Sequence, residues 1–264
     1  MLDNNLSIMK QKVALVLSMG GARGMAHIGV IEELLKHDFE ITSIAGSSMG
    51  AMIGAMYAAG KLNECKEWML TWDKRKLLQF TDIRISREGL VKGNKLMEEM
   101  RSILPPIKIE ELPIPYVALA TDIAHECEVR MDSGSLYEAI RASISLPMIF
   151  HPVKDGNRIL IDGGILNPLP IRHVARIEGD MLVAVDVNAP STQTDEKKLS
   201  PYQLLTTSSR LMMQELARNE IRQHRPDILI ELPATRFDMM EFHHAATIIE
   251  YGASEARKAL SSYQ

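Results

Sequence analysis

Two glycine-rich turns lie close together near the start of the chain, and each joins an apolar, strand-like run to a helix-like run. The first turn covers residues 20–24 after the apolar run 13–17, and the second covers 46–50 after the β-branched run 41–45. Short apolar runs of this kind are typical of buried strands. Strands that alternate with helices predict a parallel sheet with right-handed crossovers. We therefore expect an α/β fold of three layers, α/β/α, around a mostly parallel central sheet.

The second turn reads Gly-Ser-Ser-Met-Gly, a G-x-S-x-G sequence with Ser48 at its centre. In such an elbow a strand turns abruptly into a helix and exposes the central serine, while the glycines let the neighbouring chain pass close by. The helix that follows, residues 49–59, directs its positive end toward Ser48 and favours a developing alkoxide. A lone G-x-S-x-G arises often by chance, but this strand–turn–helix context predicts a nucleophile. Ser43 and Ser47 are expected to be structural.

The first turn has three interpretations. A dinucleotide-binding fingerprint needs a glycine where Met19 stands, and a phosphate-binding P-loop needs a Gly-Lys-Ser or Gly-Lys-Thr ending that is absent. What remains is a set of backbone N–H groups at a helix start, which suits an anion such as a tetrahedral oxyanion. We expect Gly20 and Gly21, together with the N–H group of Met49, to form an oxyanion hole. Arg23 could brace the loop, contact a lipid phosphate or carry a solvated charge, and bracing is favoured.

Several separate motifs carry a family resemblance. They are Gly-Gly-x-Arg-Gly at 20–24 followed by His27-x-Gly29, Gly-Ser-Ser-Met-Gly at 46–50, Ala-Thr-Asp at 120–122, residues 139–143 ahead of Pro147, and Asp-Gly-Gly-Ile-Leu-Asn-Pro-Leu-Pro at 162–170. In order and spacing, over about residues 13–187, the chain resembles the patatin-like phospholipase family, whose fold is related to but distinct from that of the α/β-hydrolases. One departure is Met19, since family members commonly begin the first turn with three glycines.

The resemblance implies a Ser–Asp dyad in which Asp162 takes the proton of Ser48 directly, without a cofactor. Taken alone, an aspartate before two glycines would more often be read as a turn residue. A carboxylate at its ordinary pKa is a weak base, and partial burial would raise that pKa and improve both proton transfers. The implied substrates are fatty acyl esters of phospholipids or related lipids, with transient contact to a membrane surface.

A serine triad with a histidine base is the alternative. Four histidines follow Asp162 in the chain order that a triad needs, and none sits in a recognisable turn after a strand: they are His173, His224, His243 and His244. His27 is expected to be structural. The pair 243–244 near Asp238 and Glu241 matches no common zinc spacing, so no metal is predicted.

Three functions share these residues. A lipid acyl hydrolase leads, an acyltransferase or thioesterase would use the same acyl-enzyme, and a non-catalytic lipid-binding protein would use only the pocket. Three methionines beside the nucleophile, Met49, Met52 and Met56, suit a pliable acyl pocket or an ordinary core.

Composition bounds the remaining choices. The 264 residues are 46% hydrophobic, which is consistent with a single domain over 1–264: core motifs at 13–187, a mobile loop at about 189–199, and C-terminal helices with one strand over 200–264. The net charge of −4 argues against nucleic acid as a partner. Two cysteines, Cys65 and Cys127, indicate a reducing compartment, and we expect the cytoplasm. The oligomeric state and the natural lipid stay open.

Other segments carry weaker signals. Lys10 and Lys12 before 13–17 imitate a signal peptide, but the apolar run falls short of about 7–15 residues and fits a first core strand better. No run approaches the roughly 18 apolar residues of a membrane span. Trp68 and Trp72 are expected in the core because of their helical spacing. Residues 81–93, within a candidate lid over 61–112, are expected to form a loop or cap.

Overall fold

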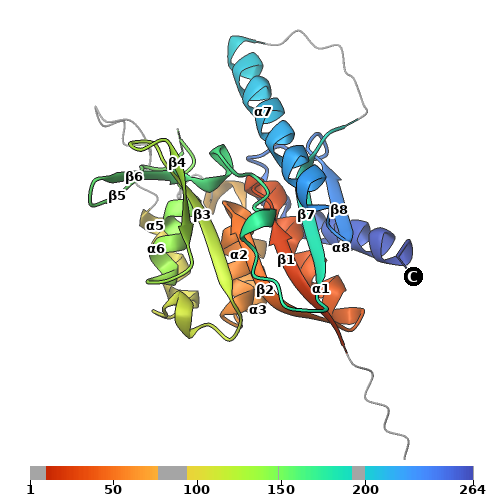
Figure 1. The fold of residues 1–264 in the computed structure, drawn as a ribbon. Helices are drawn as coiled ribbons and strands as arrows, with labels where there is room; N and C mark the ends of the chain where they lie inside the picture. Colours follow the sequence, from red (N-terminus) through yellow and green to blue (C-terminus); the bar gives the residue numbers. More distant parts are fainter. Residues whose placement is uncertain (1–9, 77–93, 148, 192–199, 264) are drawn as a thin grey trace, which may run out of the picture.

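The fold is built on one mixed sheet, shown in Figure 1. The structure is a computed structural model that describes residues 10–76, 94–147, 149–191 and 200–263. Its strands are β1 Gln11–Leu17, β2 Phe39–Ser47, β3 Tyr116–Asp122, β4 Cys127–Met131, β5 Val153–Asp155, β6 Arg158–Asp162, β7 Met181–Ala189 and β8 Ile228–Pro233. Hydrogen-bond pairing links them in the sequence β5-β6-β3-β2-β1-β7-β8, with β4 also paired to β3. The five neighbours from β3 to β8 pair in parallel, whereas β4, β5 and β6 join by antiparallel pairing.

Helices cover both faces, which confirms the expected α/β/α arrangement. The α-helices are α1 Ala26–Lys36, α2 Met49–Ala58, α3 Leu62–Leu70, α5 Asn94–Ile103, α6 Leu136–Ser143, α7 Pro201–His224 and α8 Ala245–Ser261. Side chains of β1 alternate between two cores: Val13, Leu15 and Leu17 pack with α1, α2 and α8, while Ala14 and Val16 pack beneath α7. The first core is much the larger of the two.

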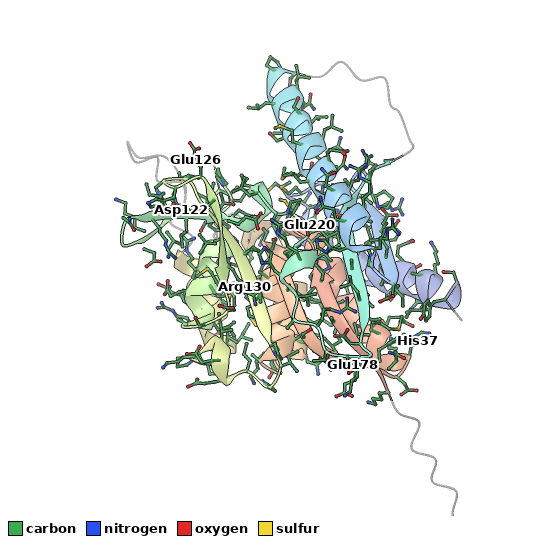
Figure 2. All side chains as sticks on the ribbon, viewed as in Figure 1. His37, Asp122, Glu126, Arg130, Glu178 and Glu220 are labelled. Atoms are coloured by element: carbon green, nitrogen blue, oxygen red, sulfur yellow. The ribbon has the colours of Figure 1, made fainter. Side chains whose placement is uncertain are left out.

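The segment that follows β6 also covers the face of the sheet that carries the smaller core. Its 3-10 turn Ile171–His173 presents Arg172, which donates to Glu220 on α7 and to Glu128 on β4. Figure 2 shows Glu220 on α7, above the sheet. These ion pairs hold the segment after Asp162 between the sheet edge and α7.

The register on β3 brings two strand ends together. β4 pairs with residues 118–122 of β3, so β2 and β6 must both use the opposite edge of that strand. On that edge Ser47, the last residue of β2, pairs with Leu119, and Asp162, the last residue of β6, pairs with Ala120. Because β2 runs parallel to β3 and β6 runs antiparallel, the ends of β2 and β6 meet head to head. Residues 48 and 162 are therefore neighbours.

The elements expected at 13–17, 41–45 and 49–59 form as β1, β2 and α2, within two residues of those bounds. The helix opened by Ser200 has its capping box, since the Ser200 hydroxyl accepts from the Gln203 amide and the Gln203 side chain accepts from the Ser200 amide. The helical spacing of Trp68 and Trp72 is interrupted, because α3 ends at Leu70, and the Thr71 hydroxyl that follows donates to the Trp68 carbonyl at 2.6 Å. The predicted cap 81–93 and most of the loop at 189–199 lie outside the described residues.

Candidate active site

Ser48 stands at a strained turn between β2 and α2. Its backbone angles are φ 54° and ψ −124°, a conformation that costs an L-residue on the order of 1–3 kcal/mol. The flanking glycines explain how the turn closes: a Cβ on Gly50 would lie 2.3 Å from the Leu17 carbonyl oxygen, and one on Gly46 would lie 2.6 Å from the Ala51 nitrogen. The G-x-S-x-G sequence is thus a packing requirement of this elbow.

The Ser48 hydroxyl donates to the Asp162 carboxylate, with Oγ 2.5 Å from Oδ2. The other carboxylate oxygen accepts from the Gly164 amide at 2.8 Å, and the Asp162 amide donates to the Ser145 carbonyl at 3.0 Å. Asp162 is fully buried, and Ser48 retains 7% exposure. Two hydrogen bonds therefore fix the carboxylate and a third fixes its backbone, with one carboxylate oxygen directed at the serine.

Burial raises the pKa of Asp162 from its ordinary 3.8 to about 7, while the hydrogen bonds from Ser48 and Gly164 oppose the shift. A carboxylate with this pKa is a far stronger base than one in water, and its conjugate acid can still return the proton near neutral pH. The arrangement suits a group that accepts and then donates a proton.

The C-terminal end of α6 supports both residues, and the motifs in the sequence assigned no role to the side chain that holds the Ser48 amide. The Ser143 hydroxyl accepts from the Ser48 amide at 2.9 Å. Two residues on, Ser145 holds the Asp162 backbone, and its hydroxyl accepts from Arg141 at 2.5 Å. Ser143 stood out only as part of a family fragment, and a buried serine at a helix end carries no stronger signal.

The first glycine turn lies beside the serine. Gly21, with φ +55°, lines the same pocket as Ser48, and a Cβ there would overlap Met239. A Cβ on Gly20 would stand 2.3 Å from the Val187 side chain. Among the described residues, the Gly20 amide donates to no protein acceptor. Met49 is the first residue of α2, directly after Ser48.

Arg23 points away from the serine and into the protein. Its guanidinium donates to the Ala234 carbonyl at 3.3 Å, the Phe237 carbonyl at 3.2 Å and the Asn188 side-chain oxygen at 2.5 Å. Burial lowers the pKa of Arg23 to about 10, which leaves the guanidinium charged at neutral pH. These contacts tie the first turn to β7 and to the segment after β8.

The histidines occupy other places. His27 is fully buried, its Nε2 donates to the Ser18 carbonyl at 2.9 Å, and burial lowers its pKa to about 4, so the ring is neutral. His173 contacts Glu128 at 3.0 Å, and the His243 and His244 rings contact each other in a tilted arrangement, with centroids 4.1 Å apart. No histidine in the described ranges hydrogen-bonds to Ser48 or Asp162, and no group of metal-binding side chains was found in those ranges.

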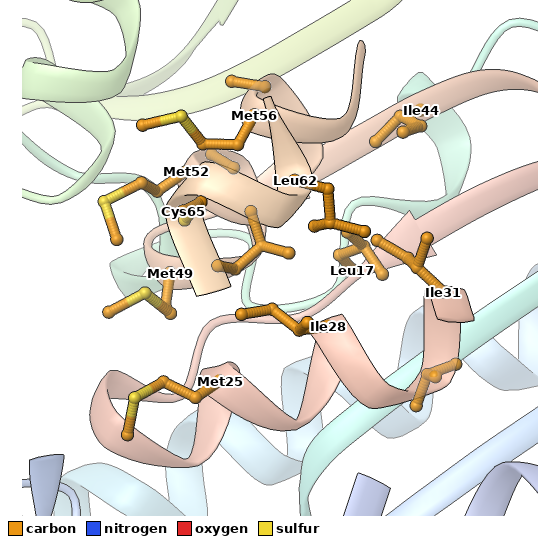
Figure 3. Close-up of a cluster of buried hydrophobic side chains, with 14 of the residues drawn as sticks. Leu17, Met25, Ile28, Ile31, Ile44, Met49, Met52, Met56, Leu62 and Cys65 are labelled. Carbon is orange, nitrogen blue, oxygen red and sulfur yellow. The ribbon is translucent and has the colours of Figure 1, made fainter. Parts of the chain in front are cut away.

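An apolar pocket opens above the serine. Its lining combines α2, the segment after α6 and the segment before α8: Gly21, Ser48, Met49, Met52, Trp72, Leu96, Ile144, Leu146, Ile149, Phe150, Met239, Met240 and Phe242. Figure 3 shows the three methionines of α2, of which Met49 and Met52 reach the pocket while Met56 is buried in the core. The two tryptophans are buried as expected, with ring centroids 4.9 Å apart.

The family model for patatin-like phospholipases matches residues 15–175, which include both turns, Ser48 and Asp162. The chain belongs to the patatin-like phospholipase family. An uncharacterised NTE family protein of Mycobacterium bovis is 30% identical over 96% of this chain and 92% of its own length. The neuropathy target esterase sws of Drosophila melanogaster is 31% identical over 72% of this chain, which corresponds to 14% of that protein.

A solved structure supports the assignment of the fold. VipD from Legionella pneumophila superposes with a TM-score of 0.51 over 97% of this chain and 67% of that chain, at 16% identity. The family assignment places the chain among lipid hydrolases. In the described part of this patatin-like protein, no helix combines the length and the apolar character that crossing a membrane requires.

Met19, the departure from the patatin-like pattern, fits into the core. Its amide donates to the Pro168 carbonyl at 2.9 Å, and its sulfur lies 2.3 Å from where a Cβ on Gly164 would stand. The methionine therefore points toward the turn after Asp162, and a glycine there makes the room. The replacement does not put a side chain into the Ser48 pocket, whose lining excludes Met19.

Proposed function

We propose that this protein hydrolyses fatty acyl esters of phospholipids or related lipids through a Ser48–Asp162 dyad and an acyl-enzyme. One observation carries the proposal: the Ser48 hydroxyl donates to a fully buried carboxylate at 2.5 Å, on the floor of an apolar pocket. A serine next to its base is the arrangement that nucleophilic catalysis requires.

The proposed reaction has two halves. Ser48 Oγ forms a bond to the ester carbonyl carbon as its proton passes to Asp162, and the carbonyl electrons move onto the oxygen. The tetrahedral intermediate then collapses, the bond to the leaving alcohol breaks, and Asp162 returns the proton to that alcohol. In the second half a water molecule attacks the acyl carbon and gives a proton to Asp162. The fatty acid leaves as Ser48 takes the proton back.

The developing oxyanion needs donors that are already in place. We assign this role to the amides of Gly20, Gly21 and Met49, because the first turn adjoins the serine and α2 directs its positive end toward it. Arg23 acts as a brace for that turn in this scheme, since its three acceptors all belong to the protein.

The apolar pocket is the proposed site of the acyl chain. Flexible methionines such as Met49 and Met52 can adjust to chains of different length.

The dyad makes a first testable prediction. Ser48→Ala should abolish hydrolysis of a phosphatidylcholine and of a short-chain ester, and Asp162→Asn should lower kcat by about 10²–10⁴-fold, the range that general base catalysis supplies. A serine-directed fluorophosphonate should label Ser48, as located by peptide mass spectrometry.

His173→Gln is the matched control, because His173 follows Asp162 in chain order and is hydrogen-bonded to Glu128 instead. Activity retained in Asp162→Asn and lost in His173→Gln would replace the dyad with a triad. Products other than free fatty acid when alcohols are added would favour a transferase. Lipid binding without hydrolysis of any ester would indicate a non-catalytic lipid-binding protein.

A further inference from the structure

Helix α7 carries an exposed apolar face that the core does not use. Five large side chains are 37–64% exposed, and we call them the apolar ridge: Leu204, Leu205, Leu211, Met212 and Leu216. They recur at separations of four and seven residues, so they share one side of the helix. The side that packs on the sheet carries Gln214, Ala217 and Ile221, and successive residues turn by about 100°, which places the ridge opposite the buried side.

The ridge stands at the edge of the sheet where Ser48 lies. The Gln214 side chain donates to the Asn188 carbonyl at 2.7 Å, near the C-terminal end of β7, which is the strand end next to the first glycine turn. The 13 residues 201–213 come before Gln214 in the helix and lie beyond this edge of the sheet. At a rise of 1.5 Å per residue they make up roughly 20 Å of helix. Figure 1 shows this half of α7 projecting clear of the rest of the molecule.

The charges differ between the two halves of α7. Residues 201–213 hold one charged side chain, Arg210, and no carboxylate, in a chain whose net charge is −4. The other half is charged, and its Glu215 pairs with Arg218 and Arg222. A projecting helix that exposes leucines and lacks carboxylates suits an apolar surface with anionic phosphates better than it suits water.

We propose that the projecting half of α7 docks the protein on the surface of a phospholipid bilayer or micelle. The ridge residues that it carries, from Leu204 to Met212, are then buried among the acyl chains. The inference rests on the proposed function, because a lipid surface is where such a hydrolase meets its substrate. Met240, 46% exposed, belongs to the pocket lining and adds a second apolar contact at the same edge. A second copy of the chain is a poorer occupant, since five side chains fall short of the roughly 20 residues per partner in a stable interface.

The experiment measures binding in the absence of turnover. The full chain with Ser48→Ala is floated with phosphatidylcholine vesicles, alone and with a second substitution, Leu205→Asp or Thr206→Asp. Both changes add one carboxylate at the same height on the exposed helix, but only position 205 lies on the ridge. Leu205→Asp should weaken vesicle binding by about tenfold or more, and Thr206→Asp by less than about twofold.

Folding and self-association are tested separately. Leu205→Asp with Ser48 intact should hydrolyse a monomeric short-chain ester within about twofold of wild type, because α7 lies outside the pocket. Equal vesicle binding by the two variants, or none by the parent, would overturn the docking inference while leaving the hydrolase intact. A dimer that Leu205→Asp converts to monomer, seen by light scattering, would assign the ridge to a second copy. If vesicle binding depends on the ridge but the wild type hydrolyses no ester, the docking inference stands and the proposed function is wrong.

Discussion

At the scale of single residues, the site depends on a carboxylate held where water cannot reach it. Asp162 accepts hydrogen bonds only from Ser48 and Gly164 among the described residues, and burial outweighs both in setting its pKa near 7. The charged form therefore costs folding free energy that an ordinary surface aspartate would not cost. That cost is the physical origin of the stronger base that the proposed mechanism requires.

The pH profile should report this group. For an ester substrate, kcat/KM should increase as the pH rises through about 7, because Asp162 must lose its proton before it can accept one from Ser48. The measurement is kcat/KM between pH 5 and 9. A profile that is already flat at pH 5 would contradict a raised pKa.

Stability should change in the opposite direction. Because the folded-state pKa is raised, wild type loses stability as the pH rises from 3.8 through about 7. Asp162→Asn removes the buried charge, so its melting temperature should exceed that of wild type at pH 8. The difference should shrink as the pH falls toward 4, because the folded-state carboxyl is then protonated and no buried charge remains. A constant difference across this range would point to a cause other than the carboxylate.

At the scale of elements, two helices approach each other through bare backbone. A Cβ on Gly29 of α1 would lie 2.0 Å from the Ile249 carbonyl oxygen of α8, and one on Gly252 of α8 would lie 2.2 Å from the Ala26 carbonyl oxygen. Neither obstacle is the end of a flexible side chain, so neither can move aside without shifting a helix. Since α1 begins right after the first glycine turn, this contact also sets where that turn lies.

Gly252→Ala should therefore destabilise the protein. Alanine in place of glycine gains about 1 kcal/mol of helix propensity, but overpacking against backbone should cost more, with a net loss of about 2 kcal/mol or more. Thermal or urea unfolding measures the loss. Ser254→Ala, two residues along the same helix and partly exposed, is the matched control and should change stability by less than about 0.5 kcal/mol. Unchanged stability in Gly252→Ala would show that the helices can separate at little cost.

At the scale of the whole molecule, Arg23 connects parts of the chain that are far apart in sequence. Its acceptors are residues 188, 234 and 237, and Asn188 in turn donates to the Met19 carbonyl and accepts from Gln214 on α7. The first glycine turn, β7, the segment after β8 and α7 thus share one buried hydrogen-bond network. Networks of this kind keep their geometry only when every member is present.

Arg23→Lys should disturb that network although it keeps the charge. A lysine ammonium lacks the planar fork that reaches three separate acceptors, and unsatisfied buried carbonyls should cost about 1–3 kcal/mol of stability. We also expect a lower kcat with little change in KM, because the turn supplies proposed oxyanion donors. Arg218→Lys on the exposed side of α7 is the control and should leave both quantities near wild type. An unchanged kcat in Arg23→Lys would show that the Arg23 hydrogen bonds do not position the proposed oxyanion donors.

Local patterns in the sequence determined the elements and pointed to Ser48 as the proposed nucleophile. The β-branched run before Gly46, the small residues after it and the capping box at Ser200 each depend on neighbours within a few positions, and such patterns encode strands, turns and helix starts directly. The family pattern added the pairing of Ser48 with Asp162, which spacing along the chain could not supply.

Only the tertiary structure decided how the site is assembled. The meeting of β2 and β6 on one edge of β3 and the Ser143 hydroxyl that holds the Ser48 amide depend on residues from 42 to 95 positions apart. The complete burial of Asp162 likewise depends on distant parts of the chain. The exposure of the ridge on α7 belongs here too, since the leucines there look like core residues in the sequence. Strand register and burial are properties of the packed chain, because each depends on which distant surfaces exclude water together.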